Sequence, residues 1–543
     1  MIPRPPDRTA ALCAGTAALF AFALSFFRIE DLDWHWYLGV GRWIVEHGAV
    51  PHTEPFSFTA AGAPYRAEHW LGEVLFYLIH AAGGTAALVT LKALLFAAMA
   101  AALTLFGARR VGPAPAALVT ALVLLATLGQ MRLRLYVLAP ALALLMVLLL
   151  ERWRSTGRGR WWLPLIALLW MNLHGSGSLA VAIVGAYLVG EALMRRWAET
   201  RRLLPVLIAC ALATLINPYG WGLWQEAWAH AVTERHHDLI SEFLPLSTLP
   251  WWRLGLLGLL IALMLGGWLR SRGRGLSPGL LIVCVAFLLM SVGARRHLSL
   301  FLWPAGVMIF QGWGGKWDSV GPMRPMGRIA AWVTCVLLVA LAVLTLTDRI
   351  YLLLGSERRA GCSMKRGVVP EEALDELRAF GVGGRLFTTY ENGGLVIARA
   401  PEFRVFIDNR YRPFEAILGE YANVAHAAPG WQQVLDRWEI NLCLVDPALL
   451  DLIEALHQSP LWSLVALTGD GAVFARRSQT LPEIEVTPAI AIWRGAHPLP
   501  GARWPWQADP YPREHLQMAR MAERLGAEEA ARRLSAEVSN HWP

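Results

Sequence analysis

Eleven apolar runs, each close to or somewhat below the length that crosses a bilayer, occupy most of the first 350 residues. A helix needs about 20 apolar residues to span the hydrocarbon core. Backbone groups in lipid must be satisfied internally, which helices do within one segment. The sequence therefore predicts an α-helical polytopic membrane protein with about 11 transmembrane helices. The runs lie near residues 9–27, 84–107, 113–130, 136–151, 161–173, 177–194, 203–217, 252–269, 277–293, 298–312 and 328–347.

Composition supports the same class. The chain is 55% hydrophobic and only 17% charged, and its mean hydropathy is +0.41. These values exclude an ordinary soluble enzyme. The net charge of +8 comes from basic residues that anchor loops and do not form a stripe, so we expect no nucleic-acid partner.

The loops between the runs predict the orientation. Basic residues concentrate on alternate loops, which the positive-inside rule places in the cytoplasm. We therefore expect a multi-pass protein of the bacterial inner (cell) membrane with a cytoplasmic amino terminus and an uncleaved first anchor. Everything after about Asp348 is then extracytoplasmic, in the periplasm. The basic segments are Arg4/Arg8, Arg109/Arg110, ERWRSTGRGR, MRRWAETRR, LRSRGRG and GGKWDSVGPMRPMGR.

The carboxy-terminal third differs from the rest of the chain. Its short apolar runs GRLFTTY, GGLVIARA, FRVFIDN and INLCLVD alternate with helix-like stretches such as PEEALDELRAF. This alternation indicates a small extracytoplasmic α/β domain. We predict a transmembrane domain over 1–347 with a first outer loop over 28–83, an α/β domain over 348–508, and a tail of one or two amphipathic helices over 509–543.

The first outer loop is far longer than a hairpin turn. Within it, Trp36, Val40, Trp43 and Ile44 share one helical face, while His35, Arg42 and Glu46 share another. Two interpretations remain open: a Trp-anchored helix lying flat at the membrane interface, or a helix that takes part in substrate binding.

Three carboxylates, Glu30, Asp31 and Asp33, come directly after the first run. Carboxylates in this position suit a proton-accepting base or a cation site. The alternative is that two of them cap the amino terminus of the following helix.

Two arginine pairs fall on the predicted outer side, against the positive-inside bias: Arg132/Arg134 and Arg295/Arg296. Such pairs need an anionic partner, and a lipid phosphate or pyrophosphate suits them. Ion pairs with the first-loop acids, or headgroup contacts, are the alternatives. The motifs WMNLHG, with Asn172 and His174, and NPYG lie on the same side.

Metal and cysteine chemistry have weaker signals. The segment WQEAWAHAVTERHHDLISEF offers Glu226, His230, His236, His237 and Asp238 at loose spacing, with a solvated loop helix as the alternative. Cys13, Cys210, Cys284 and Cys335 fall within the apolar runs and are expected to pack there. A disulfide between Cys362 and Cys443 stays open.

The segments DLDWHWYLGVGRWIVEHGAVP, PYRAEHWLGEVLFYLI, WMNLHG and NPYG together resemble the GT-C superfamily of polyprenyl-phosphate-sugar-dependent glycosyltransferases. They are similar in particular to bacterial relatives of the protein O-mannosyltransferase and aminoarabinose transferase branch. The resemblance is strongest over the membrane part. It implies a GT-C-like bundle whose long first outer loop carries interfacial helices.

The resemblance also implies roles for individual residues. Asp33, or else Asp31, would be the base that deprotonates the acceptor hydroxyl. Glu68 would bind a divalent metal or orient the donor, and His69 stands where relatives often carry a basic residue. The donor phosphate would be held by Arg132, Arg134, Arg295, Arg296, His69 and His174.

The expected partners are a polyprenyl-phosphate-linked sugar, membrane lipid and an acceptor glycan, lipid or protein. Fold resemblance does not carry activity with it, so two other functions stay open. One is an outer-face ligase that moves a lipid-linked glycan. The other is a non-catalytic scaffold or transport component of polysaccharide export.

Overall fold

A computed structural model describes residues 8–232, 243–273, 275–314, 325–354, 356, 358–410, 412–478, 481–497 and 513–541. The chain divides into two compact units. The first, here the bundle unit, comprises Met1–Arg28, Glu68–Gly72 and Gly83–Cys362. The second, here the loop–sheet unit, comprises Ile29–Ala67, Glu73–Ala82 and Ser363–Pro543. Most of the first outer loop therefore groups with the carboxy-terminal residues.

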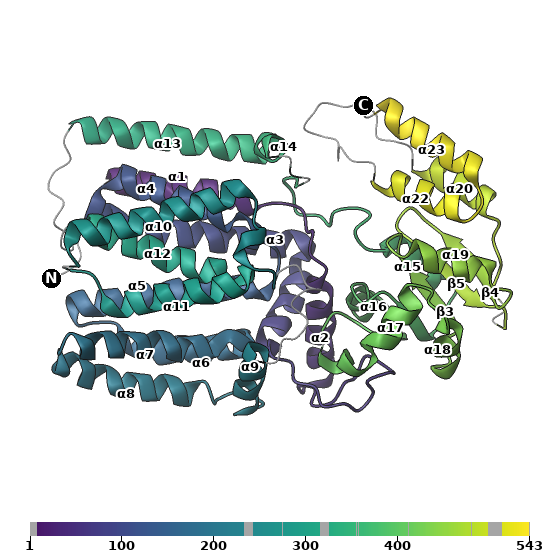
Figure 1. Ribbon diagram of the computed structural model, residues 1–543, viewed down its shortest axis with the longest axis horizontal. Helices are drawn as coiled ribbons and strands as arrows, with labels where there is room; N and C mark the ends of the chain where they lie inside the picture. The colour runs from purple at the N-terminus through teal and green to yellow at the C-terminus, as the bar shows by residue number, and fades with distance from the viewer. Residues whose placement is uncertain are drawn as a thin grey trace. The chain divides into compact units, whose positions relative to one another are not determined.

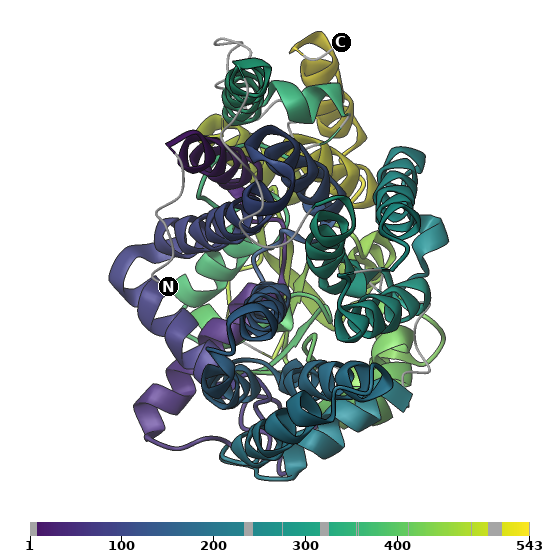
Figure 2. The ribbon, with the colours of Figure 1, turned by 90° about the vertical axis from the view of Figure 1, so that its left-hand side faces the viewer.

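Each of the eleven apolar runs is helical, as expected. Seven helices among the described residues are long and apolar enough to cross a membrane. In Figure 1 the bundle helices lie side by side, and Figure 2 views them close to end-on. The helices that contain the eleven apolar runs are α1 (Arg8–Ser25), α3 (Trp70–Val111), α4 (Pro113–Thr127), α5 (Leu138–Thr156), α6 (Leu163–Leu173), α7 (Ser178–Leu193), α8 (Trp197–Ala213), α10 (Trp251–Ser271), α11 (Pro278–Gly293), α12 (Leu298–Trp313) and α13 (Pro325–Leu346).

Helix α12 forms the centre of the bundle unit. Its residues from Leu298 to Gly312 are buried, and it packs against α4, α5, α10 and α11. A helix that is apolar all round needs protein contacts on every side. Helix α12 is therefore a buried helix with protein neighbours around it.

Charged groups inside the bundle unit are matched by neighbours. The ammonium of Lys92 lies 3.9 Å from the ring centre of Phe27, and the guanidinium of Arg358 lies 4.3 Å from the same ring. Arg154 donates to the buried carboxylate of Glu191 over 2.6 Å. The four cysteines of the apolar runs are all buried, as expected for packing residues.

The loop–sheet unit contains a five-stranded sheet with the order β2-β1-β3-β5-β4. Strands β1 (Gly384–Thr388), β2 (Phe403–Val405) and β3 (Leu442–Val445) are parallel, whereas β4 (Trp462–Leu467) and β5 (Ala472–Arg476) form an antiparallel pair. The buried residues of β3 alternate between two apolar clusters. Leu442 and Leu444 belong to one cluster, and Cys443 and Val445 to the other. The sheet is thus covered on both faces.

Helices supply the two covering layers. Those of the first layer are α15 (Glu371–Ala379) and α16 (Gly393–Arg399). The opposite layer contains α17 (Leu418–Ala425), α18 (Trp431–Arg437), α19 (Leu450–Gln458), α20 (Val486–Ala496), α22 (Arg513–Arg524) and α23 (Glu528–His541). The described residues of the tail therefore form two helices. Of the four short apolar runs in the carboxy-terminal third, GGLVIARA forms helix α16, whereas the other three contain strands.

Helix α2 (Asp33–His47), the predicted first-loop helix, packs against protein. A Cβ atom added at Gly39 would lie 2.3 Å from Ile397 of α16, and one at Gly41 would lie 2.1 Å from the carbonyl oxygen of Glu73. Arg42 donates to the carbonyls of Ile397 and Ala398 at the end of α16. Val40 and Ile44 of the expected lipid-facing stripe are buried in this unit. Close backbone packing therefore holds α2, and this accounts for its glycines.

His35 corrects the expectation of a polar face on α2. Its side chain is buried and its ring lies tilted against that of Trp34, and its Nδ1 lies 3.4 Å from the Leu32 carbonyl. Burial lowers the pKa of His35 to about 3. The ring is therefore a neutral part of the core at physiological pH.

This burial predicts acid sensitivity. The unfolded chain takes up a proton at His35 below about pH 6.5, whereas the folded chain does not until about pH 3. Stability should therefore fall by about 1.4 kcal/mol per pH unit in this window. Thermal unfolding of the detergent-solubilised protein at pH 7.5 and 5.5 tests this. His35→Gln should remove about that part of the pH dependence, while the exposed-site control His47→Gln should keep it. Equal pH slopes in all three proteins would refute the assignment.

Candidate functional site

Asp31 and Asp33 occupy different positions at the start of α2. Asp31 is buried, and its Oδ1 accepts a hydrogen bond from the backbone N–H of Asp33 over 3.0 Å. It thereby satisfies a backbone donor where the helix begins. Asp33 is the first residue of α2 and is only partly buried. Asp33 is therefore the more accessible of the two carboxylates.

Asn409, which the sequence did not single out, contacts Asp33. Its Nδ2 donates to Oδ1 of Asp33 over 2.6 Å. Asn409 follows the strand β2 in the segment FRVFIDNR, at the carboxyl end where parallel strands commonly present polar side chains. The run of polar residues directly after a buried strand was the available signal.

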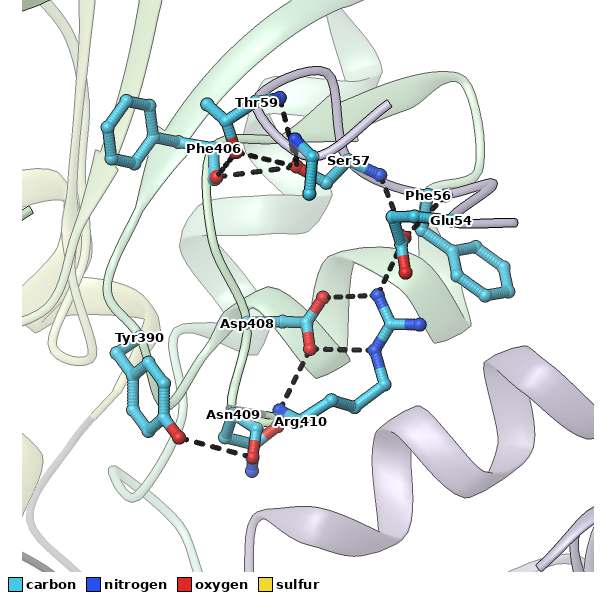
Figure 3. Close-up of polar contacts among 10 residues, drawn as sticks. Glu54, Phe56, Ser57, Thr59, Tyr390, Phe406, Asp408, Asn409 and Arg410 are labelled. Atoms are coloured by element: carbon cyan, nitrogen blue, oxygen red, sulfur yellow. Dashed lines mark hydrogen bonds and ion pairs between the residues drawn. The ribbon is translucent and has the colours of Figure 1, made fainter. Parts of the chain in front are cut away.

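A sealed ion network flanks Asn409, as Figure 3 shows. Arg410 binds Asp408 through two hydrogen bonds, of 2.8 Å from Nε and 2.6 Å from Nη2, and Nη2 also donates to Glu54 over 2.8 Å. The exposed fractions of the three side chains are 2% for Arg410 and 0% for both carboxylates. Burial alone would lower the pKa of Arg410, but the Asp408 and Glu54 carboxylates raise it well above its ordinary value. We call these three residues the ion triad.

The first loop also joins the edge of the sheet. Ser57 forms a parallel bridge with Val405 of β2, and the Thr59 hydroxyl donates to the carbonyl of Phe406 over 2.5 Å (Figure 3). Glu54 adds to this contact, since its Oε1 accepts the backbone N–H groups of Phe56 and Ser57. The loop thus covers the edge strand β2 and brings Glu54 to the triad.

Histidines of the bundle unit form a second polar cluster. The rings of His69 and His174 stack with centres 4.3 Å apart, and Tyr136 packs edge-on against His174. The Tyr136 hydroxyl lies 3.3 Å from Nδ1 of His297, and Nε of Arg296 donates to the other nitrogen of that ring. Three predicted phosphate residues, His69, His174 and Arg296, are therefore brought into one cluster, which we call the histidine cluster.

Both stacked rings have a defined tautomer. The backbone N–H of Gly175 donates to Nδ1 of His69, and that of Ser176 donates to Nδ1 of His174. An accepting Nδ1 leaves the ring proton on Nε2. The Nε2–H groups of His69 and His174 are therefore the hydrogen-bond donors that these two rings provide.

Arginines form a third cluster in the same unit. Arg253 is buried and donates to Gln130 Oε1 and to the carbonyl of Ala126, and Gln130 donates to the carbonyl of Arg295. The charges of Arg132, Arg295 and Arg358 all act on Arg253. We call these four residues the arginine cluster. Arg134 is half-buried and follows Arg132 in the same short segment.

Two members of the arginine cluster were missed in the sequence. Arg253 is a single charge at the start of an apolar run, WWRLG, and Arg358 follows the last run in SERRAG. Isolated charges at the ends of apolar runs usually contact lipid headgroups. Only its burial in the structure distinguishes Arg253 from such an arginine.

The motif asparagines have structural roles. Asn172 accepts from the Trp70 indole and donates to the carbonyl of Ile216. Asn217 donates to the carbonyls of Thr214 and Gly220, which closes the NPYG turn. These motifs therefore shape the loops around the histidine cluster.

Metal ligation has limited support. Among the described residues, no group of three or more His, Cys, Asp or Glu side chains is arranged to hold a metal ion. Glu68 lies against Gly175, where an added Cβ atom would approach Oε2 to 2.6 Å. In the loop expected to offer a loose metal set, residues 233–242 with His236, His237 and Asp238 lie outside the described residues. Cys362 and Cys443 are both free thiols.

The ion triad predicts a large and selective loss of stability. Arg410→Met leaves two buried carboxylates without a countercharge and should cost about 3–5 kcal/mol. The control Arg437→Met removes a surface ion pair with Glu420, in which the side chains of Arg437 and Glu420 are 60% and 30% exposed. This variant should lose less than about 1 kcal/mol of unfolding free energy. Thermal unfolding followed by tryptophan fluorescence measures both. Similar losses in the two variants would contradict the buried-network description.

The comparison with solved structures identifies the fold. The chain is similar to the crystal structure of Archaeoglobus fulgidus oligosaccharyltransferase tethered with an acceptor peptide containing the NVT sequon, with a TM-score of 0.52 at 14% sequence identity. The apo form of that enzyme gives 0.49 at 12% identity. Both alignments cover 87% of this chain and 74% of that chain. No protein-family model and no curated protein sequence matches. This chain is a multi-pass membrane protein whose fold is similar to that of this oligosaccharyltransferase.

Proposed function

We propose that the protein is a membrane glycosyltransferase of GT-C type that moves a sugar from a polyprenyl-phosphate donor to an acceptor, with Asp33 as the base. The carrying observation is the placement of Asp33, a partly exposed carboxylate at the start of α2 that is fixed by Asn409. Transfer with inversion needs a base to take the proton of the acceptor hydroxyl. Asp33 supplies this group in a defined orientation. Asp31, buried at the helix start, supports the geometry.

The arginine and histidine clusters are the proposed donor site. The charges of Arg132, Arg295 and Arg358 act on Arg253, and guanidinium groups form charge-assisted hydrogen bonds with phosphate oxygens. A polyprenyl phosphate carries such oxygens at the end of a membrane-embedded chain. Arg132, Arg134, Arg295 and Arg296 then neutralise the leaving phosphate, and Nε2–H of His69 or His174 donates to it. Glu68, beside Gly175, would orient the donor or a divalent metal.

The proposed place of the reaction is the outer face of the bacterial inner membrane. This proposal rests on the basic loops, which put the amino terminus in the cytoplasm and the α/β domain in the periplasm. A ligase that moves a larger lipid-linked glycan uses the same chemistry and remains the alternative, in keeping with the fold likeness to an oligosaccharyltransferase. A scaffold in polysaccharide export would need no base.

Replacement of Asp33 tests the base. The assay measures release of polyprenyl phosphate from a panel of polyprenyl-phosphate sugars and lipid-linked oligosaccharides, with a cell-envelope fraction as acceptor and the protein in lipid nanodiscs. Asp33→Asn should lower release by roughly 10²- to 10⁴-fold without changing the unfolding temperature. Full activity in Asp33→Asn would refute the base. A wild-type protein that binds the donors and releases nothing would favour the scaffold.

Replacement of single arginines tests the donor site. Loss of one charge-assisted hydrogen bond costs about 1.5–3 kcal/mol, so Arg132→Gln and Arg295→Gln should each weaken binding of a polyprenyl phosphate by roughly 10- to 100-fold. Arg202→Gln is the matched control, because Arg202 is an exposed arginine of α8 paired with Glu199. Unchanged affinity in both cluster variants would place the phosphate elsewhere.

A further inference from the structure

Asn409 lies between two residues of the ion triad. Its chain neighbours Asp408 and Arg410 bind each other, and Arg410 also binds Glu54, whereas the amide of Asn409 binds Asp33. The five side chains come from two segments far apart in the sequence, the first outer loop and the end of β2. One short turn of chain therefore connects a sealed ion network to a partly exposed carboxylate.

The backbone of this turn is held on several sides. Arg410 donates its backbone N–H to Asp408 Oδ1 over 3.0 Å. The Tyr390 hydroxyl lies 3.4 Å from the carbonyl of Asn409, as drawn in Figure 3. Upstream, the backbone N–H of Phe406 donates to Leu386 of β1. The backbone that carries Asn409 is thus held by contacts that do not involve Asp33.

The chemistry of the contact suits a base. An amide N–H that donates to a carboxylate favours its ionised form and fixes the plane of the carboxyl group. A lysine or arginine in the same place would form an ion pair and hold the carboxylate more tightly, which weakens it as a proton acceptor. A neutral donor orients Asp33 and lowers its basicity less than an ion pair would.

We propose that Asn409 is a positioning residue for Asp33, held in place by the ion triad, so that the carboxy-terminal domain supplies part of the catalytic site. The role of this contact in catalysis rests on the proposed function, whereas the coupling of Asn409 to the ionisation of Asp33 does not. Charged or titratable groups beside α2 include Asp31, which precedes it, Glu73 and His80 of α3, and Arg399 of α16. The variants below leave all of them in place.

Carbodiimide labelling measures the coupling directly. Dicyclohexylcarbodiimide adds to protonated carboxyl groups, so the fraction of Asp33 labelled in the full-length protein across a pH series, read by mass spectrometry of its peptide, gives a midpoint. Asn409→Ala removes the donor and should raise this midpoint by roughly 1 pH unit. Asn409→Asp places a second carboxylate beside Asp33 and should raise it further. The control Asn423→Ala, in which the lost amide bonds only the carbonyl of Pro429, should leave it unchanged.

The same variants carry a kinetic readout. If Asp33 is the base, the acid limb of the pH–rate profile should move with the labelling midpoint in Asn409→Ala, and kcat should fall by roughly tenfold or more at neutral pH. Glu54→Gln keeps the acceptor oxygen but weakens the triad, and should give a smaller shift in the same direction.

The two hypotheses fail in different ways. An unchanged labelling midpoint in both Asn409→Ala and Asn409→Asp, in protein that unfolds at the wild-type temperature, would overturn the positioning inference. A shifted midpoint together with full transfer by Asp33→Asn would leave the coupling intact and refute the base.

Discussion

The loop–sheet unit depends on a guanidinium that is sealed between two carboxylates. Removing ions from water is expensive, and this cost is recovered only when the geometry is close and every strong donor and acceptor is used. Arg410 provides close geometry, with two hydrogen bonds to Asp408 and a third to Glu54, whereas its Nη1 and Oε2 of Glu54 have no hydrogen-bond partner among the described residues. Because Glu54 comes from the first loop and Asp408 from the end of β2, the two segments must meet for the charges to be matched. Asn409, between the two triad residues of this segment, then contacts Asp33 at the start of α2.

Local sequence patterns were sufficient for the helices. Apolar length is a property of a single segment, and a segment in lipid has few alternatives to a helix, so the eleven runs are helical. The amphipathic spacing of the tail likewise identified α22 and α23. The run GGLVIARA was harder, because a short apolar run fits a buried strand or a buried helix equally well. Its packing against α2 through Gly39 is a tertiary contact that periodicity does not report.

The candidate site was only partly predictable for the same reason. Asp31 and Asp33 were visible as carboxylates directly after an apolar run, but their different roles depend on burial and on one backbone hydrogen bond. Asn409 was hidden, because its only local signal is a polar residue after a strand. Arg253 resembled a headgroup anchor until its contacts with Gln130 and Ala126 were known. Side chains that acquire their role through distant partners carry little local pattern.

The hydrogen bond between Asn409 and Asp33 joins residues 376 positions apart, which has a consequence for biogenesis. A ribosome that adds about 5–20 residues per second needs about 20–75 s to proceed from one residue to the other. During that interval the nascent chain already contains Asp33 but neither Asn409 nor the arginine that completes the triad. The carboxylate therefore acquires its geometry only late in synthesis, so an incomplete or truncated chain in the membrane holds an unorganised Asp33.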